Sequence, residues 1–209
     1  MKKYVIVLGA GGHAKVVIEL LHESGYQVDF CVGEEGSPKN CLGIPVLLGE
    51  QNLIRLRDDG YVFAFPAIGS NFVRERAAIH AVSLGYELVN AISHRAVVSP
   101  SAALGVGIAI MGGVIINAEC KIENLTIINT GTTVDHGCHI GDCAHIAPQC
   151  ALAGDVKVGR RVFLGIGTIV IPNIKIGDDA TTGAGSVVIS NLPASTTVVG
   201  HPAKPLKNS

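Results

Sequence analysis

Histidine and aspartate side chains that could move protons lie close together near residue 140 of this 209-residue chain. His136, His139 and His145 fall within ten residues of one another, and Asp135 and Asp142 lie among them. An imidazole has an ordinary pKa of about 6.5, so it can accept a proton at neutral pH. The stretch is therefore a candidate site for proton transfer or for zinc. The alternative is a solvated face without chemistry.

A second candidate site is the glycine turn Gly9-Ala10-Gly11-Gly12-His13-Ala14. It follows an apolar strand pattern and opens a helical pattern, a context in which backbone N–H groups bind a phosphate. Its spacing fits the permissive G-x-G-x-x-A form, which alone is a weak signal for NAD. No clear ribose-binding acid ends the second strand, where Val32-Gly33-Glu34-Glu35 stands instead. The turn predicts nucleotide-phosphate binding, and the alternative is a structural turn.

A six-residue period runs through the second half of the chain and determines how the histidines are placed. Such a period predicts a solenoid, in which each short strand buries one branched side chain in a shared core. The positions four residues later are mostly small, as a narrow prism of three sheets requires. The aliphatic positions are Ile92, Val98, Leu104, Ile110, Ile116, Ile122, Ile128, Val134, Ile140, Ile146, Leu152, Val158, Leu164, Val170 and Ile176, followed by Thr182 and Val188.

This register also assigns directions to the candidate side chains. His136 stands two residues after an interior position and is expected to point outward, whereas His139 and His145 immediately precede interior residues. A coil of three six-residue sides has 18 residues, so all three histidines belong to one coil. The β-helical carbonic anhydrases, which the histidine cluster resembles, draw their zinc ligands from different coils, so this resemblance implies no zinc site here. For His139 we favour the solvated face. The period does not give the handedness of the coil, since parallel crossovers are right-handed by default.

The six cysteines are predicted to be structural. Cys120, Cys138 and Cys150 occupy the small interior position of the repeat, where a thiol behaves as a small apolar group. The other three form no C-x-x-C pair that would indicate a metal or redox site.

The first part of the chain alternates strand and helix patterns, which predicts a small parallel sheet, about half of a doubly wound nucleotide fold. We therefore expect an α/β domain at residues 1–88 and a β-helix with a C-terminal tail at 89–209. The expected strands are 4–8, 27–32 and 62–68, and the expected helices are 14–23 and 74–84.

Composition excludes several kinds of partner. The net charge is −1 without a run of like charges, so nucleic acid and anionic membrane surfaces are not expected partners. The mean hydropathy of +0.43 is high, but no apolar run reaches the ~18 residues of a spanning helix. The apolar N-terminal run is also too short for a signal peptide, so a cytoplasmic location is expected.

Several motifs occurring together resemble the bacterial nucleotide-amino-sugar N-acetyltransferases. This family includes the bacillosamine- and perosamine-pathway acetyltransferases and the sialic-acid O-acetyltransferase relatives. The resemblance covers essentially the whole chain and implies a left-handed β-helix, a homotrimer, and acetyl-CoA bound in the groove between subunits. The motifs are Gly-x-Gly-Gly-His-Ala-Lys at residues 9–15, Ala-Ile-Gly-Ser-Asn at 67–71 with Arg74, Asn-Thr at 129–130 with Val-x-His-x-Cys at 134–138, Phe-Leu-Gly-Ile at 163–166, and Val-Gly-His-Pro-Ala-Lys at 199–204.

The same resemblance implies roles for individual residues. His136 matches the general base of the family, and Asp135 or Asp142 could take the place of the acid that usually follows it, because this chain has Gly137 there. For acetyl-CoA, the implied contacts are His145, Ile166 and Ala184, with Lys204 a candidate for a coenzyme A phosphate. For the nucleotide sugar, they are Gly11, Gly12, His13, Gly33, Glu34, Gly69 and Asn71.

The predicted activity is direct transfer of an acetyl group from acetyl-CoA to the amine of a nucleotide-linked 4-amino-4,6-dideoxy sugar, without a metal and without an acyl-enzyme. Two alternatives stay open. One is O-acetylation of sialic acid or a related sugar, and the other is a non-catalytic nucleotide-sugar-binding subunit. An NAD-dependent enzyme is the weakest alternative, because no hydride-transfer site is apparent.

Overall fold

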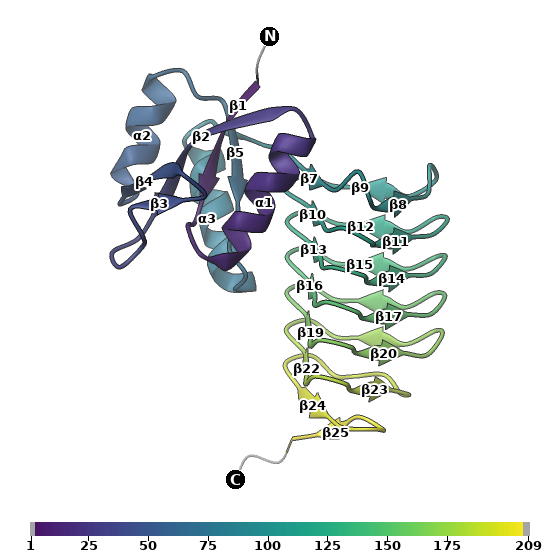
Figure 1. The fold of residues 1–209 in the computed structure, drawn as a ribbon. Coiled ribbons are helices and arrows are strands. Elements are labelled where there is room, and N and C mark those ends of the chain that lie inside the picture. The colour runs from purple at the N-terminus through teal and green to yellow at the C-terminus, as the bar shows by residue number, and fades with distance from the viewer. Residues whose placement is uncertain (1–2, 207–209) are drawn as a thin grey trace. The chain divides into compact units, whose positions relative to one another are not determined.

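The computed structural model describes residues 3–206 and divides into two compact units between Ser93 and His94. The first unit is a six-stranded sheet with helices, in the order β3-β4-β2-β1-β5-β6. All pairs are parallel except β3 with β4. Its elements are β1 (Lys3–Leu8), α1 (Gly12–Glu23), β2 (Tyr26–Gly33), β3 (Asn40–Cys41), β4 (Ile44–Leu48), α2 (Gln51–Asp58), β5 (Phe63–Pro66), α3 (Asn71–Ser83) and β6 (Glu87–Leu88) (Figure 1).

The carboxyl ends of β1 and β5 create the place where a ligand can bind. From β1 the chain goes to β2 on one side, whereas β5 flanks β1 on the other, so the strand order reverses there. Backbone hydrogen bonds continue past the strands, from Gly9 N to Val32 O (2.7 Å) and from Ala67 N to Leu8 O (2.8 Å). The glycine turn and the segment after β5 therefore meet at the switch point of the sheet, where α/β folds bind ligands.

The helix that follows the glycine turn, α1, buries the apolar residues whose spacing in the sequence predicted a helix. In α1, Ala14, Val17, Ile18, Leu20 and Leu21 are buried on one side. The helix ends at Glu23 and is followed by the capping residue Ser24 and by Gly25 in a left-handed conformation. The strands and helices predicted from the sequence are present, with ends that differ by a few residues.

The segment between β2 and β5 was not predicted. It contains the two-strand hairpin β3-β4 and the eight-residue α2, in which only Leu53 and Leu56 are buried. Such short elements carry too few apolar positions to show a period, and their burial comes from packing against the sheet. Leu53 and Leu56 belong to the same core as Ile6, Leu8 and Val32.

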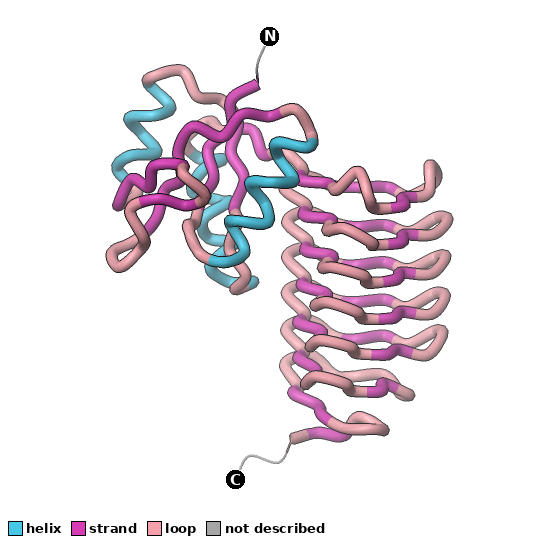
Figure 2. The backbone as a smooth tube through the Cα atoms, in the orientation of Figure 1, coloured by secondary structure: helices cyan, strands magenta, loops and turns pink. Residues whose placement is uncertain are grey.

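From β7 (Ala91–Ile92) onward the chain forms a β-helix of short strands, nearly all two residues long, in three sheets. Figure 2 shows its stacked coils. Up to β23, strands three apart in sequence pair in parallel, and the paired residues lie 18 apart, as in Ile110 with Ile128 and Ile128 with Ile146. At the end of the β-helix, β24 pairs in parallel with β22 and antiparallel with β25. The sheets are β25-β24-β22-β19-β16-β13-β10-β7, β23-β20-β17-β14-β11-β8 and β21-β18-β15-β12-β9, here called the first, second and third faces. Their strands are β7 (Ala91–Ile92), β8 (Val97–Val98), β9 (Ala103–Leu104), β10 (Ala109–Ile110), β11 (Ile115–Ile116), β12 (Lys121–Ile122), β13 (Ile127–Ile128), β14 (Thr133–Val134), β15 (His139–Ile140), β16 (His145–Ile146), β17 (Ala151–Leu152), β18 (Lys157–Val158), β19 (Phe163–Leu164), β20 (Ile169–Val170), β21 (Lys175–Ile176), β22 (Thr181–Thr182), β23 (Val187–Val188), β24 (Thr197–Val199) and β25 (Lys204–Pro205).

The interior of the β-helix confirms the six-residue register. Its aliphatic positions from Ile110 onward are buried, and so are the small positions four residues later, including Cys120, Cys138 and Cys150. Burial raises the pKa of the Cys138 thiol to about 12, which keeps it protonated at neutral pH. Buried threonines satisfy their hydroxyls locally, as when Thr168 Oγ1 donates to Gly165 O (2.7 Å).

The high hydropathy thus belongs to β-helix core residues. Within residues 3–206, no helix is long and apolar enough to cross a membrane. The cytoplasmic location stays a prediction from the sequence.

Candidate functional site

A cavity of about 430 Å³ opens at the switch point of the first unit. It brings together residues from the ends of β1, β2 and β5 and from the start of α1. Most of the residues predicted to bind the nucleotide sugar line it: Gly11, Gly12, His13, Gly33, Glu34 and Gly69.

Asn71, the remaining predicted contact, lies next to this cavity and holds a buried arginine. Arg74 Nη2 donates to Asn71 Oδ1 (2.8 Å), and Arg74 Nη1 donates to Ile68 O (2.9 Å) and Gly69 O (3.2 Å). Arg74 is only 1% exposed. Its guanidinium therefore fixes the segment after β5, a role that the sequence analysis did not assign.

His13 is neutral in this environment. Burial, and then the positive charge of Arg74, lowers the pKa of His13 to about 4. At neutral pH the ring can thus donate or accept a hydrogen bond toward a nucleotide but brings no positive charge.

The depressed pKa of His13 predicts a pH effect on stability. Between pH ~6.5 and pH ~4 the unfolded chain binds a proton at this site that the folded chain does not, so stability falls as the pH is lowered through this window. His13→Asn is expected to reduce this fall. Urea unfolding from pH 7 to pH 4 measures it, and parallel curves for both proteins would contradict the assignment.

The lining of the same cavity also contains a pair of side chains that the sequence did not indicate. Glu50 and His80 both line it, and their Oε2 and Nδ1 atoms lie 3.4 Å apart. Glu50 lies in the loop before α2 and His80 in the last turn of α3. No sequence motif contains both residues.

His136 is exposed at the corner between the second and third faces, as its register predicted. Asp135 Oδ1 accepts hydrogen bonds from His136 N (2.8 Å) and Asn117 Nδ2 (2.9 Å). These bonds, the one from His136 N first, lower the pKa of the Asp135 carboxyl group. The ionised Asp135 therefore holds the backbone of the corner that carries His136.

The unusual glycine after His136 also has a structural explanation. Gly137 has a φ of +67°, and a Cβ there would collide with Asp155 Oδ1 from the next coil. The carboxylate of Asp155 thus lies where a side chain at position 137 would start. Asp142, the other acid considered, lies at the next corner, where its Oδ1 accepts from Asn124 N (3.1 Å).

A second cavity, of about 510 Å³, follows the first face of the β-helix and its corner with the second face. The predicted acetyl-CoA residues His145, Ile166 and Ala184 line it. The His145 ring lies 3.2 Å from Asn129 Nδ2 and makes an edge contact with Phe163, with ring centroids 5.2 Å apart. Lys204, predicted for the same ligand, lies in β25 and is not among the residues that line this cavity.

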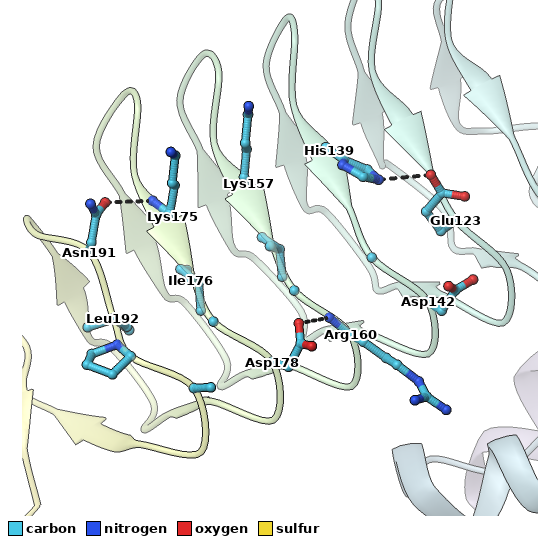
Figure 3. A pocket seen from close by; sticks show the side chains of 16 residues that line it. Glu123, His139, Asp142, Lys157, Arg160, Lys175, Ile176, Asp178, Asn191 and Leu192 are labelled. Carbon is cyan, nitrogen blue, oxygen red and sulfur yellow. Dashed lines mark hydrogen bonds and ion pairs between the residues drawn. The ribbon is translucent and has the colours of Figure 1, made fainter.

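A third cavity, of about 870 Å³, is a groove along the third face (Figure 3); Asp142 lines it, but none of the residues predicted to bind the nucleotide sugar or acetyl-CoA does. Lys157 and Lys175 stand side by side there on successive strands, and His139 Nε2 pairs with Glu123 Oε1 at 2.8 Å. Both partners of this pair are about half exposed. The groove is a charged, solvated surface, and its size alone is no argument for chemistry.

The described part of the chain offers no cluster of three His, Cys, Asp or Glu side chains that could hold a metal ion. The free cysteines are all buried, and Cys143 is among them although it lies outside the interior positions of the repeat.

Two family models match the chain. Residues 4–80 match the PglD N-terminal domain, and residues 155–190 match the bacterial transferase hexapeptide model of six repeats. The matched ranges coincide with the sheet that carries the first cavity and with the coils that carry part of the second.

Solved structures match over the whole chain. A histidine-to-asparagine variant of perosamine N-acetyltransferase from Caulobacter crescentus, solved with CoA and GDP-perosamine, has 46% identity and a TM-score of 0.95, covering 98% of this chain and 97% of that one. The acetyltransferase domain of PglB from Neisseria gonorrhoeae has 32% identity and a TM-score of 0.93, covering 98% and 100%. The fold is thus a half-Rossmann-like domain followed by a left-handed β-helix.

Proposed function

Since the chain belongs to the nucleotide-amino-sugar N-acetyltransferases, we propose that it moves the acetyl group of acetyl-CoA to the amine of a GDP-linked 4-amino-4,6-dideoxy sugar. The observation that supports this most strongly is the match over the whole chain to a perosamine N-acetyltransferase solved with CoA and GDP-perosamine. Both cavities lie in the matched range.

The two units divide the work in this proposal. The α/β domain, residues 1–88, binds the nucleotide at the glycine turn, where Gly11, Gly12 and His13 line the cavity at the start of α1, a helix end whose backbone N–H groups suit a phosphate. The β-helix domain, residues 89–209, binds acetyl-CoA along His145, Ile166 and Ala184. Lys204 does not line the acetyl-CoA cavity but stays a candidate for binding a phosphate of coenzyme A.

His136 acts as the general base. One ring nitrogen of His136 takes a proton from the sugar amine while the amine nitrogen forms a bond to the carbonyl carbon of the thioester. The C–S bond then breaks, and the coenzyme A thiolate leaves and receives a proton. Positioned proton transfer contributes about 10²- to 10⁴-fold in rate, and holding both substrates together contributes further. Transfer is direct, because burial keeps the nearby Cys138 and Cys150 thiols protonated and away from substrate.

A homotrimer is part of the proposal, and the second face of the β-helix supports it. Val97, Ile115 and Ile169 lie on this face with exposures of 63%, 40% and 48%. Exposed apolar side chains in one row favour association with a copy of the chain. His136 and the acetyl-CoA cavity lie at the opposite corners of this face. Packing the second faces around a three-fold axis would therefore bring His136 of one subunit to the cavity of the next.

A substrate panel tests the acceptor. Release of free CoA is measured with GDP-, UDP- and dTDP-linked 4-amino-4,6-dideoxy sugars and with free sialic acid. The GDP-linked sugar is expected to give the highest kcat/KM. Preference for free sialic acid would support O-acetylation instead, and no release with any acceptor would support a non-catalytic binding subunit.

A further inference from the structure

The coil that follows His136 carries a glycine directly beneath the imidazole ring. Gly154 lies 18 residues after His136, at the same corner of the β-helix. A Cβ atom on Gly154 would lie 2.5 Å from Cε1, 2.7 Å from Nε2 and 3.2 Å from Nδ1 of His136. Real Cβ contacts are essentially never shorter than 3.0 Å, so the ring occupies space that only glycine leaves open.

The backbone does not explain this glycine. Several corners of the β-helix turn through residues with positive φ, but Gly154 is not one of them. An alanine could adopt its backbone conformation without strain.

Packing between coils does not explain it either. At Gly141 and Gly165 the nearest atoms to an added Cβ include backbone atoms of the next coil, at 2.8 Å and 2.5 Å. Those glycines let the coils stack. At Gly154 the three nearest atoms all belong to the ring of His136.

The corner also prevents the coils from separating to make room. Asp155 N donates to His136 O (2.9 Å), and Asn173 N donates to Gly154 O (3.0 Å). These bonds link three successive coils at this corner. A side chain at position 154 would therefore move the ring and leave the coil in place.

We propose that Gly154 is a positioning residue for acetyl transfer: its bare Cα is the surface on which the His136 imidazole rests, and it sets where the ring meets the acceptor amine. The proposal rests on the proposed role of His136 as the base.

A double-mutant cycle tests this with Gly154→Ala, His136→Ala and the double variant. In the wild-type background, Gly154→Ala is expected to lower kcat about 10- to 100-fold, because a displaced base is nearly as harmful as a missing one. The KM for acetyl-CoA is expected to stay the same. In the His136→Ala background, the same substitution is expected to leave the residual rate unchanged.

Thermal unfolding of the same four proteins separates positioning from folding. Gly154→Ala should lower Tm when the imidazole is present. In the His136→Ala background it should leave Tm equal or raise it, since alanine restricts the unfolded chain. If Gly154→Ala alone does not fold, recovery of folding in the double variant supports the proposal.

Two results would overturn the inference about Gly154 alone: full activity of Gly154→Ala while His136→Ala is inactive, or equal losses of Tm in both backgrounds. Full activity of His136→Ala would instead contradict the proposed role of His136 as the general base.

Discussion

Replacing His136 with alanine is expected to lower kcat at least about 100-fold, because the acceptor amine then loses the group that takes its proton. Acetyl-CoA binding should change little, since His145, Ile166 and Ala184 line a cavity at a different corner of the β-helix. Steady-state release of CoA measures kcat, and calorimetric titration with CoA measures binding.

His139→Ala is the matched control for this experiment. His139 lies in the same coil, but its ring pairs with Glu123 on the solvated third face. Its loss is expected to leave kcat unchanged. Equal rates for wild type and His136→Ala would show that the base is another group.

The second large effect is expected from Ile169→Asp on the apolar second face. Aspartate there would place a charge among the apolar side chains of the proposed interface, and an unpaired charge is costly to bury. The variant is expected to run as a monomer and to lose nearly all turnover, because His136 and the acetyl-CoA cavity would no longer meet. Light scattering after gel filtration gives the mass, and CoA release gives the rate.

Ile54→Asp is the matched control, since Ile54 is a similarly exposed isoleucine (52%) on α2 in the first unit. It should leave mass and rate unchanged. If Ile169→Asp were still a trimer, the second face could not be the subunit interface. An active monomer would show that one chain holds the whole site.

The regular part of the molecule could be predicted from its sequence because equivalent positions in successive repeats of the β-helix lie in the same environment. A branched residue every six positions gave the coil, the buried cysteines and the outward direction of His136. The hairpin β3-β4 and α2 could not be found, because Leu53 and Leu56 are recognisable as core only once the sheet lies beneath them.

The candidate sites show a similar division. The glycine motif indicated Gly11, Gly12 and His13, because a phosphate-binding turn is local in sequence, whereas Gly69 was implied by the family resemblance. Contacts between coils have no local signature. The placement of Asp155 against Gly137, and of Gly154 beneath His136, depends on residues one coil apart. The 18-residue period places such pairs at predictable positions in the sequence.

The most direct test of this account is to identify the product of one reaction. Purified protein is incubated with acetyl-CoA and a GDP-linked 4-amino-4,6-dideoxy sugar, and the nucleotide sugar is then analysed by mass spectrometry and NMR. We predict one acetyl group, bonded to the sugar nitrogen, formed in equal amount with free CoA. An acetyl group on a sugar oxygen, or an unchanged nucleotide sugar, would contradict the account.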